Sequence, residues 1–254
     1  MIHETKNYDK ITHLFGDWPE TMIWSCLQNI MGRIFINDTD NPSTAMAVLG
    51  DFCFMAGTPD KELISCMPEY CEKDFIIMVP QNDEWAAHIE ECRKEDAKKV
   101  ERYAIKKEGN IFDKEFLQTV VDGLSDEYQL KMIDEALFHR CRELSWCRDW
   151  VALYDDYAHY EKYGLGAIIL KDGEIVSGAS SYSSYNGGIE VEIDTRQDYR
   201  RKGLAYAAGA KLILECLKRG LYPSWDAQNK WSVALAEKLG YHYSHTYTAY
   251  EICV

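Results

Sequence analysis

The sequence predicts a mixed α/β fold of the α+β type, with a mostly antiparallel sheet flanked by helices and a smaller N-terminal α/β domain. Residues 165–195 alternate like three successive strands, joined at Lys171-Asp172-Gly173 and Asn186-Gly187-Gly188, whose residues tolerate positive φ. Helical and strand patterns then alternate as far as the C-terminus. Because strands joined by such short turns are antiparallel, a doubly wound parallel sheet is excluded.

The second half has the clearer order of elements. The segment before the three strands is expected to be helical and ends at Gly164. Its apolar residues recur at helical spacing: Leu137, Cys141, Leu144, Cys147 and Val151. After the strands we expect a helix over 203–219, a short strand over 221–227, a helix over 229–240 and strands over 241–254.

The first half predicts strands around a helix. Residues 29–57 read as two strands, and residues 75–80 as a short buried strand that ends at Pro80. A helix follows over 82–96, and the segment 98–108 alternates like an edge strand. A polar stretch around residue 125 then separates two domains, 1–125 and 126–254.

Charge narrows the class of partner. Lysine and arginine total 28 against 42 aspartates and glutamates, a formal net charge of -14. Nucleic acids and anionic membranes require a basic surface, so neither is expected as a partner, whereas a cationic ligand such as an amine is favoured. No apolar run approaches the ~20 residues that span a bilayer.

The cysteines indicate a reducing compartment. No two form a Cys-x-x-Cys pair, and the N-terminus has no signal-peptide core, so we expect reduced thiols in a cytoplasmic protein. His139, Cys141 and Cys147 fit no zinc spacing well, and we interpret them as buried structural residues, with no metal site. The nine cysteines are Cys26, Cys53, Cys66, Cys71, Cys92, Cys141, Cys147, Cys216 and Cys253.

The stretch "YRRKGLA", residues 199–205, lies where a strand leads into a helix. The first-turn amides of a helix have no intrahelical acceptor and favour anions. Gly203 lacks the Cβ that would hold a phosphate away from the backbone, and three cations precede it. Taken alone, the stretch fits a phosphate site and a solvated helix start about equally.

Two spaced motifs resemble those of the GNAT superfamily of N-acetyltransferases. Arg200-x-x-Gly203-x-Ala205 resembles its [Q/R]-x-x-G-x-[G/A] motif, and "NKWSVALAEKLGY", from Asn229 to Tyr241, resembles its second segment. The resemblance covers roughly residues 140–254. The sequence around these motifs resembles still more closely a bacterial subgroup of the superfamily that has an extra N-terminal half.

The resemblance implies a splayed sheet that binds acetyl-CoA as co-substrate. The strands 189–195 and 222–227 would diverge around the pantetheine, and the loop and helix start would hold the pyrophosphate. The cofactor-binding residues that it implies are Ile193, Asp194, Thr195, Arg200, Arg201, Lys202, Gly203, Leu204, Ala205, Asn229 and Ser232.

Glu190 and Glu192 are the candidates for the general base, because they lie on the strand beside the expected thioester. They share a face with Asp194, opposite Val191 and Ile193, unless a bulge in this strand exchanges the faces. A solvated strand face is the alternative interpretation. Deprotonating an alkylammonium near pH 7 costs about 4 kcal/mol, whereas positioning the reactants contributes about 7–11 kcal/mol.

The sequence departs from the family pattern at one position. Many members have a tyrosine seven residues after the asparagine, which protonates the departing thiolate, and Ala236 stands there. A thiolate with a pKa of about 8.5 leaves tolerably without a dedicated acid. Tyr206, Tyr241 or Tyr243 could substitute, although packing explains each of them more simply.

The expected function is acetyl-CoA-dependent acetylation of a primary amine of a small cationic acceptor, by direct attack in a ternary complex. Trp225 and Asp226 are candidate substrate residues, and packing and helix capping explain them about equally well. The alternative function is a non-catalytic acyl-CoA sensor or an interaction protein of the same fold. We interpret the N-terminal half as a degenerate second copy, which either closes over the acceptor or forms a homodimer interface.

Overall fold

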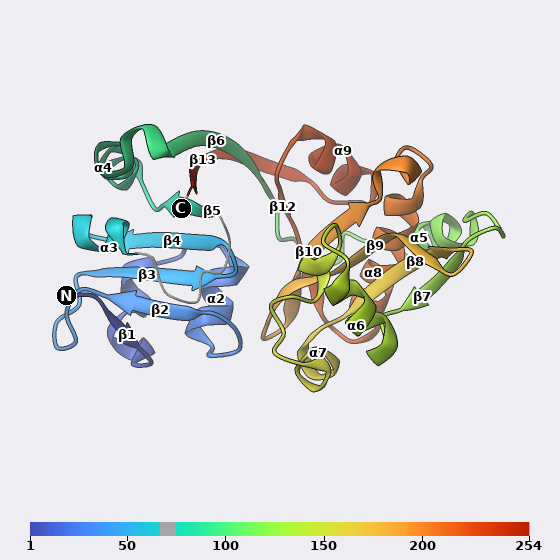
Figure 1. Ribbon diagram of the computed structural model, residues 1–254, viewed down its shortest axis with the longest axis horizontal. Helices are drawn as coiled ribbons and strands as arrows, with labels where there is room; N and C mark the ends of the chain where they lie inside the picture. Colours follow the sequence, from blue (N-terminus) through green and yellow to red (C-terminus); the bar gives the residue numbers. More distant parts are fainter. Residues whose placement is uncertain (67–74, 254) are drawn as a thin grey trace. The chain divides into compact units, whose positions relative to one another are not determined.

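The computed structural model describes residues 1–66 and 75–253, so that Cys71 lies outside the described residues (Figure 1). The chain forms two compact units, Met1–Arg102 with Thr246–Val254, and Tyr103–His245. The sequence placed a boundary near residue 125, but helix α5 (Lys114–Asp122) packs on α8 (Leu204–Lys218) within the second unit.

The first unit contains helices α1 to α4 and the strands β1 to β5. Two strands, β6 and β13, each begin in one unit and end in the other. The bounds are β1 His3–Thr5, α1 Thr12–Phe15, α2 Thr21–Leu27, β2 Arg33–Ile36, β3 Thr44–Leu49, β4 Phe52–Gly57, α3 Lys61–Ser65, β5 Phe75–Pro80, α4 Asp83–Arg93, β6 Ala97–Ile105 and β13 Tyr243–Cys253.

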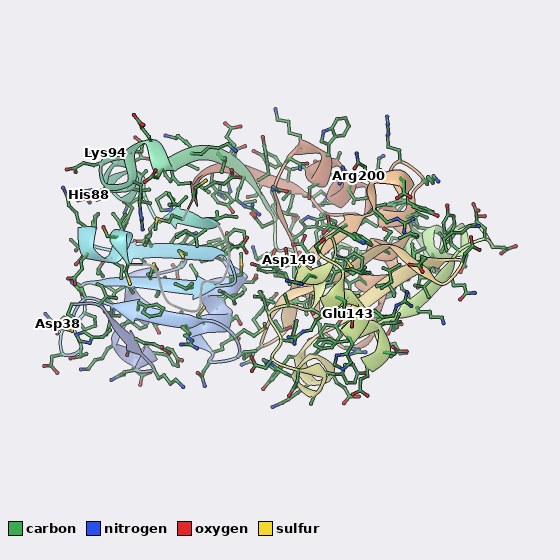
Figure 2. The ribbon with its side chains drawn as sticks, in the orientation of Figure 1. Asp38, His88, Lys94, Glu143, Asp149 and Arg200 are labelled. Carbon is green, nitrogen blue, oxygen red and sulfur yellow. The ribbon has the colours of Figure 1, made fainter. Side chains whose placement is uncertain are left out.

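Strands β1 to β4 of the first unit pair in order and antiparallel, β4 pairs with β5 in parallel, and β13 follows β5. The prediction of two strands over 29–57 was wrong, because the chain turns at Gly50, with φ +60, and divides the second predicted strand into β3 and β4. Strand β6 lies between β13 and β12, so the prediction of an edge strand was also wrong. Helix α4 has Asn82 as its N-cap and ends at Arg93, and Lys94, which Figure 2 labels, is its C-cap.

The second unit holds the predicted three-strand arrangement. Its sheet has the order β7-β8-β9-β10-β11, and every pairing is antiparallel except that of β10 with β11. The remaining bounds are β7 Gln129–Met132, α6 Glu135–Glu143, α7 Tyr157–Tyr163, β8 Gly166–Lys171, β9 Glu174–Tyr185, β10 Gly188–Thr195, β11 Tyr222–Ser224, β12 Asp226–Ala227 and α9 Lys230–Lys238.

The single helix predicted before the strands is divided in three. Helices α6 and α7 flank a short 3-10 helix, η3 (Arg148–Trp150), and the Asp156 side chain caps α7 through His159 N at 2.8 Å. The apolar spacing continued across the break because Cys147, Trp150 and Val151 are all buried in and beside η3. Trp150 packs over Gly178 of β9, where an added Cβ would lie 2.6 Å from its ring.

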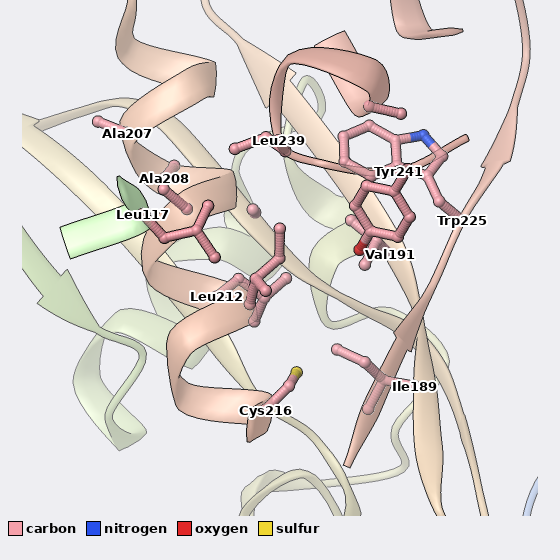
Figure 3. Packing of buried hydrophobic residues seen from close by; sticks show 14 of the residues in the cluster. Leu117, Ile189, Val191, Ala207, Ala208, Leu212, Cys216, Trp225, Leu239 and Tyr241 are labelled. Atoms are coloured by element: carbon pink, nitrogen blue, oxygen red, sulfur yellow. The ribbon is translucent and has the colours of Figure 1, made fainter. Parts of the chain in front are cut away.

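Helix α8 covers the other face of this sheet. Its Ala208, Leu212 and Cys216 lie in one core with Ile189 and Val191 of β10 (Figure 3). Because successive residues of a strand face opposite sides, this packing turns the even-numbered residues of β10 away from α8.

The two units share one order of elements. Two helices precede three antiparallel strands in each, and a helix, a strand parallel to the third, and another helix follow. The last strands are exchanged: β13 follows α9 but pairs with β5, and β6 follows α4 but its end pairs with β12. A shared order of this kind is what the interpretation of the first unit as a second copy of the fold predicts.

We expect Leu212→Ala to lower the free energy of unfolding by about 2–5 kcal/mol, because it removes a fully buried side chain between α8 and the sheet. Lys218→Ala, an exposed change on the same helix, should stay within about 0.5 kcal/mol of the parent. Urea denaturation measures both, and equal stability of the two variants would contradict this packing.

Candidate functional site

Strands β10 and β11 part after three residue pairs. Glu190 pairs with Ser224, and beyond this point the chain of β11 turns away, so that Asp226 of β12 pairs with Ala104 of β6. Within the described residues, β10 therefore has no strand partner on its β11 side from Ile193 to Thr195. The divergence that the resemblance implied is present. The predicted backbone contacts lie on its open edge.

The loop from β10 to α8 carries the predicted phosphate-binding residues. Arg201 and Gly203 both adopt left-handed backbone, with φ of +60 and +78, and Arg200 Nε donates to Thr195 O at 3.3 Å. Arg200, Arg201, Lys202 and Gly203 are exposed. A Cβ on Gly203 would meet no atom within 4 Å, so the space above it is open.

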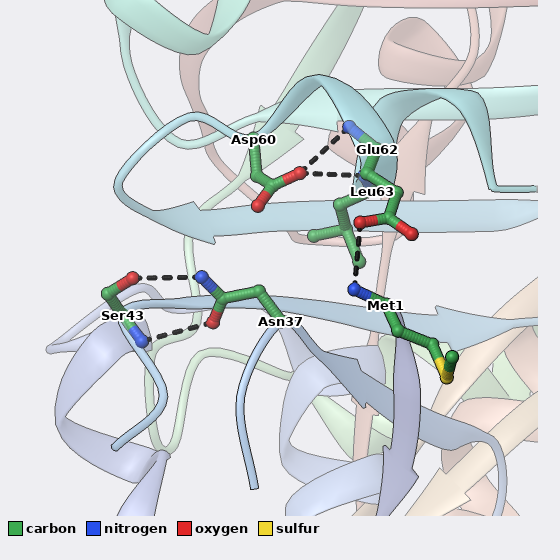
Figure 4. A network of polar contacts seen from close by, with 6 residues as sticks. All are labelled: Met1, Asn37, Ser43, Asp60, Glu62 and Leu63. Carbon is green, nitrogen blue, oxygen red and sulfur yellow. Dashed lines mark hydrogen bonds and ion pairs between the residues drawn. The ribbon is translucent and has the colours of Figure 1, made fainter. Parts of the chain in front are cut away.

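Helix α8 begins without a capping side chain. Gly203 is its N-cap residue, no side chain accepts from its first amides, and its first turn has no acidic residue. In the first unit, the corresponding helix α3 begins differently, because the Asp60 carboxylate accepts from Glu62 N at 2.8 Å and Leu63 N at 3.0 Å (Figure 4). The start of α8 is thus suited to an external anion, whereas at α3 the Asp60 carboxylate already occupies the first amides.

The acidic face of β10, formed by Glu190, Glu192 and Asp194, lies opposite Val191 and Ile193, as the sequence predicted. Ile189, Val191 and Ile193 contact the α8 core, so Glu190, Glu192 and Asp194 face the opposite side. The register shifts between Glu190 and Val191, but the extra residue, Tyr182, belongs to β9. The alternation of β10 is therefore kept. Burial decreases along this face, from 5% exposed at Glu190 to partly exposed side chains at Glu192 and Asp194.

Asp194 is the carboxyl whose ionisation the structure perturbs. Burial raises its pKa from 3.8 to about 6, and Asp149 of η3 acts in the same direction, whereas a hydrogen bond with Glu192 and the charge of Arg200 lower it. Asp149 and Arg200 both belong to the second unit and are labelled in Figure 2. This part of the face therefore gains negative charge as the pH rises through about 6.

Hydrogen bonds within the protein link Asn229, Ser232 and Trp225. Asn229 Oδ1 caps α9 by accepting from Trp231 N and Ser232 N, both at 3.0 Å, and Ser232 Oγ accepts from Trp225 Nε1 at 3.0 Å. Trp225 is 3% exposed and packs edge-on against Tyr241 (Figure 3). Trp225 was interpreted either as a substrate residue or as a packing residue, and these contacts support packing. Asp226 lies in β12 and is partly exposed.

The tyrosines considered as substitutes for the missing acid have other partners. Tyr206 Oη donates to Lys238 O at 3.3 Å, and Tyr241 Oη donates to Pro223 O at 2.7 Å. Burial raises the pKa of Tyr241 well above its usual value. Ala236 is fully buried, and Tyr243 is 38% exposed at the start of β13.

Residues that the sequence did not single out surround Glu190. Ser183 of β9 and Ser224 of β11 are its direct neighbours across the sheet, and both are fully buried. Burial raises the pKa of Tyr185 and Tyr222, and the negative charge of Glu190 adds to the rise. The serine-rich run "SSYSSY" in an otherwise buried strand was the signal that could have revealed this cluster.

The structure shows neither a metal centre nor a membrane span in the residues that it describes. Residues 1–66 and 75–253 contain no group of three or more histidine, cysteine or acidic side chains placed to hold a metal ion. No described helix is long and apolar enough to cross a bilayer.

The chain belongs to the GNAT acetyltransferase family, whose model matches residues 12–250. It is 27% identical to the uncharacterised N-acetyltransferase YdfB of Bacillus subtilis strain 168, over 96% of this chain and 95% of the relative. It is 46% identical to a GCN5-related N-acetyltransferase-like protein from Streptococcus suis 89/1591, with a TM-score of 0.92 over 96% and 98% of the two chains. A GCN5-related N-acetyltransferase from Kribbella flavida, 16% identical, shares the fold at a TM-score of 0.59 over 91% and 94%.

We expect Asp194→Asn to be more stable than the parent at about pH 7.5, by about 1–2 kcal/mol after allowance for partial exposure. Between pH 3.8 and about 6 the folded protein holds a proton that the unfolded chain releases, so the stability of the parent falls as pH rises. Near pH 4 the two proteins should therefore differ little.

Urea denaturation at the two pH values measures this difference. Asp198→Asn is the matched control, because its pKa is shifted in the opposite direction: the hydrogen bond with Arg196 lowers the pKa of Asp198. This variant should therefore not be more stable than the parent. An Asp194→Asn variant that is less stable than the parent at the higher pH would contradict the desolvation of this carboxyl.

Proposed function

We propose that this GNAT family member transfers the acetyl group of acetyl-CoA to a primary amine of a small cationic acceptor, by direct attack in a ternary complex. The observation that carries the proposal is the divergence of β10 from β11 beside the uncapped, cation-bearing start of α8. We also propose a cytoplasmic location, which the free thiols of the described cysteines support.

The binding of acetyl-CoA uses two sets of backbone donors. The open edge of β10 from Ile193 to Thr195 offers strand-like hydrogen bonds to the amide groups of pantetheine, in the way that a strand binds an extended peptide. The amides at the start of α8 bind the pyrophosphate, and Arg201 and Lys202 add charge-assisted contacts.

The acceptor binds on the acidic face of β10, opposite the α8 core. The net charge of -14 draws cations toward the protein, and Glu192 and Asp194 concentrate negative charge beside the open edge. Glu190 and Glu192 are the candidates for the base that takes the ammonium proton. Positioning of the amine supplies most of the rate enhancement, and the base adds to it.

A non-catalytic acyl-CoA sensor is the second candidate function. Ala236 replaces the usual tyrosine, and the hydroxyls of Tyr206 and Tyr241 donate to backbone carbonyls, so neither is placed as a ready acid for the thiolate. A sensor would bind acetyl-CoA through the same backbone groups but would release no thiol with any amine.

We expect the double variant Arg201→Ala/Lys202→Ala to bind acetyl-CoA about 10–100-fold more weakly, because it loses two charge-assisted contacts to phosphate. Acetyl-CoA at 100 times its Kd should stabilise the parent by about 2.7 kcal/mol, which a thermal-shift titration detects. The dependence of affinity on salt should also weaken in the variant.

Lys218→Ala is the matched control, since it removes an exposed cation at the opposite end of α8. It should bind acetyl-CoA like the parent. An equal loss of acetyl-CoA affinity in both variants would indicate a general charge effect and would contradict pyrophosphate binding at Arg201 and Lys202.

We expect Glu190→Gln or Glu192→Gln to lower kcat about 10²–10⁴-fold while acetyl-CoA binding is retained, because an amide cannot accept the ammonium proton. Release of free thiol from acetyl-CoA across a panel of primary amines measures turnover. Unchanged rates in both variants would refute a base on this strand, and absence of thiol release in the parent would favour the sensor.

A further inference from the structure

Three polar side chains form a row across the sheet of the second unit. Ser183 of β9 and Ser224 of β11 lie directly opposite Glu190 of β10, on its two sides. Residues paired in this way project on the same face, and neighbouring strands are about 4.8 Å apart. The row is buried, because both serines are fully covered and Glu190 is 5% exposed.

The two serine hydroxyls of the row are buried without a partner in the described part of the chain. Among the residues that the structure describes, neither Ser183 Oγ nor Ser224 Oγ has a hydrogen-bond partner. The next serines of β9 differ, since Ser181 Oγ accepts from Tyr154 Oη at 2.6 Å and Ser184 Oγ donates to Tyr163 O at 2.6 Å. Buried hydroxyls are nearly always hydrogen-bonded, so an exception on each side of a carboxylate indicates a place for a polar ligand.

We propose that Ser183, Glu190 and Ser224 form the subsite for the primary ammonium of the acceptor, an inference that rests on the proposed function. An ammonium group has three donors and no acceptor, and this row presents one carboxylate and two hydroxyl oxygens as three acceptors. The carboxylate supplies the counter-charge that a buried cation requires. The subsite therefore selects a primary amine over a quaternary or tertiary one.

The position of the row fits this ligand. Glu190 and Ser224 are the last pair before β10 and β11 diverge, so the row borders the gap proposed for the thioester. The same face becomes partly exposed at Glu192 and Asp194, so acidic side chains that solvent reaches lie on the same strand as Glu190. Burial raises the pKa of Tyr185 and Tyr222, and the negative charge of Glu190 acts in the same direction.

The test compares the parent with Ser183→Ala/Ser224→Ala. The probe is n-butylamine, titrated calorimetrically in an amine-free buffer with acetyl-CoA present, and butyltrimethylammonium is the control cation that has no N–H donor. We expect the parent to bind n-butylamine in preference to the control, and the double variant to bind it at least about 10-fold more weakly with unchanged affinity for acetyl-CoA.

Thermal unfolding distinguishes a ligand-binding role from a structural one. The double variant should melt at or above the temperature of the parent, since it removes two buried hydroxyls that have no partner in the described structure. Ser184→Ala should melt lower, because it breaks the hydrogen bond to Tyr163 O.

Equal n-butylamine affinity in the parent and the double variant would overturn the subsite, as would equal binding of n-butylamine and butyltrimethylammonium or no binding of n-butylamine to the parent. Thiol release is measured separately. A parent that binds n-butylamine through the row but releases no thiol would contradict the proposed transfer and leave the subsite supported.

Discussion

The end of the pairing between β10 and β11 is the constraint on which the rest of the site depends. A strand edge inside a protein must satisfy its backbone groups, and from Ile193 to Thr195 no neighbouring strand does so on this side in the described structure. The edge stays open because the chain leaves β11 at Trp225, whose side chain is fixed by Tyr241 and by Ser232. A core tryptophan thus holds open an edge that a ligand can bind.

The two units differ at the start of the helix that follows their third strand. Both place a helix after their third strand, but Asp60 occupies the first amides of α3, whereas Gly203 leaves those of α8 without a side-chain acceptor. The salt bridge from the Met1 amino group to Glu62 adds a cation beside α3 from the chain itself (Figure 4). The difference is local, one side chain at the N-cap, and it is why we propose the start of α8, and not that of α3, as the anion site.

Local patterns made much of the second unit predictable. The turns at Gly173 and Gly187, the α9 cap at Asn229 and the alternation of β10 each follow from neighbouring residues, and the structure has all of them. The motif from Arg200 to Ala205 also fixed the position of the helix start.

Pairings between distant residues were not predictable in this way. The approach of Asp149 to Asp194, the extra residue at Tyr182 and the exchange of β6 and β13 depend on contacts that no local pattern encodes. Ser183 and Ser224 flank Glu190 only because the register of three strands brings them together. The order of the elements from β8 to α9 was therefore readable from the sequence, whereas the serines beside Glu190 were not.

Amide hydrogen exchange with and without acetyl-CoA tests whether the open edge of β10 and the start of α8 bind this ligand, because it reports on the backbone groups themselves. We expect slower exchange in peptides that cover Ile193–Thr195 and the first turn of α8, with no change at Glu62 and Leu63, whose amides Asp60 already occupies. Unchanged exchange along β10 and α8 at saturating acetyl-CoA, or protection that appears equally at the start of α3, would contradict it.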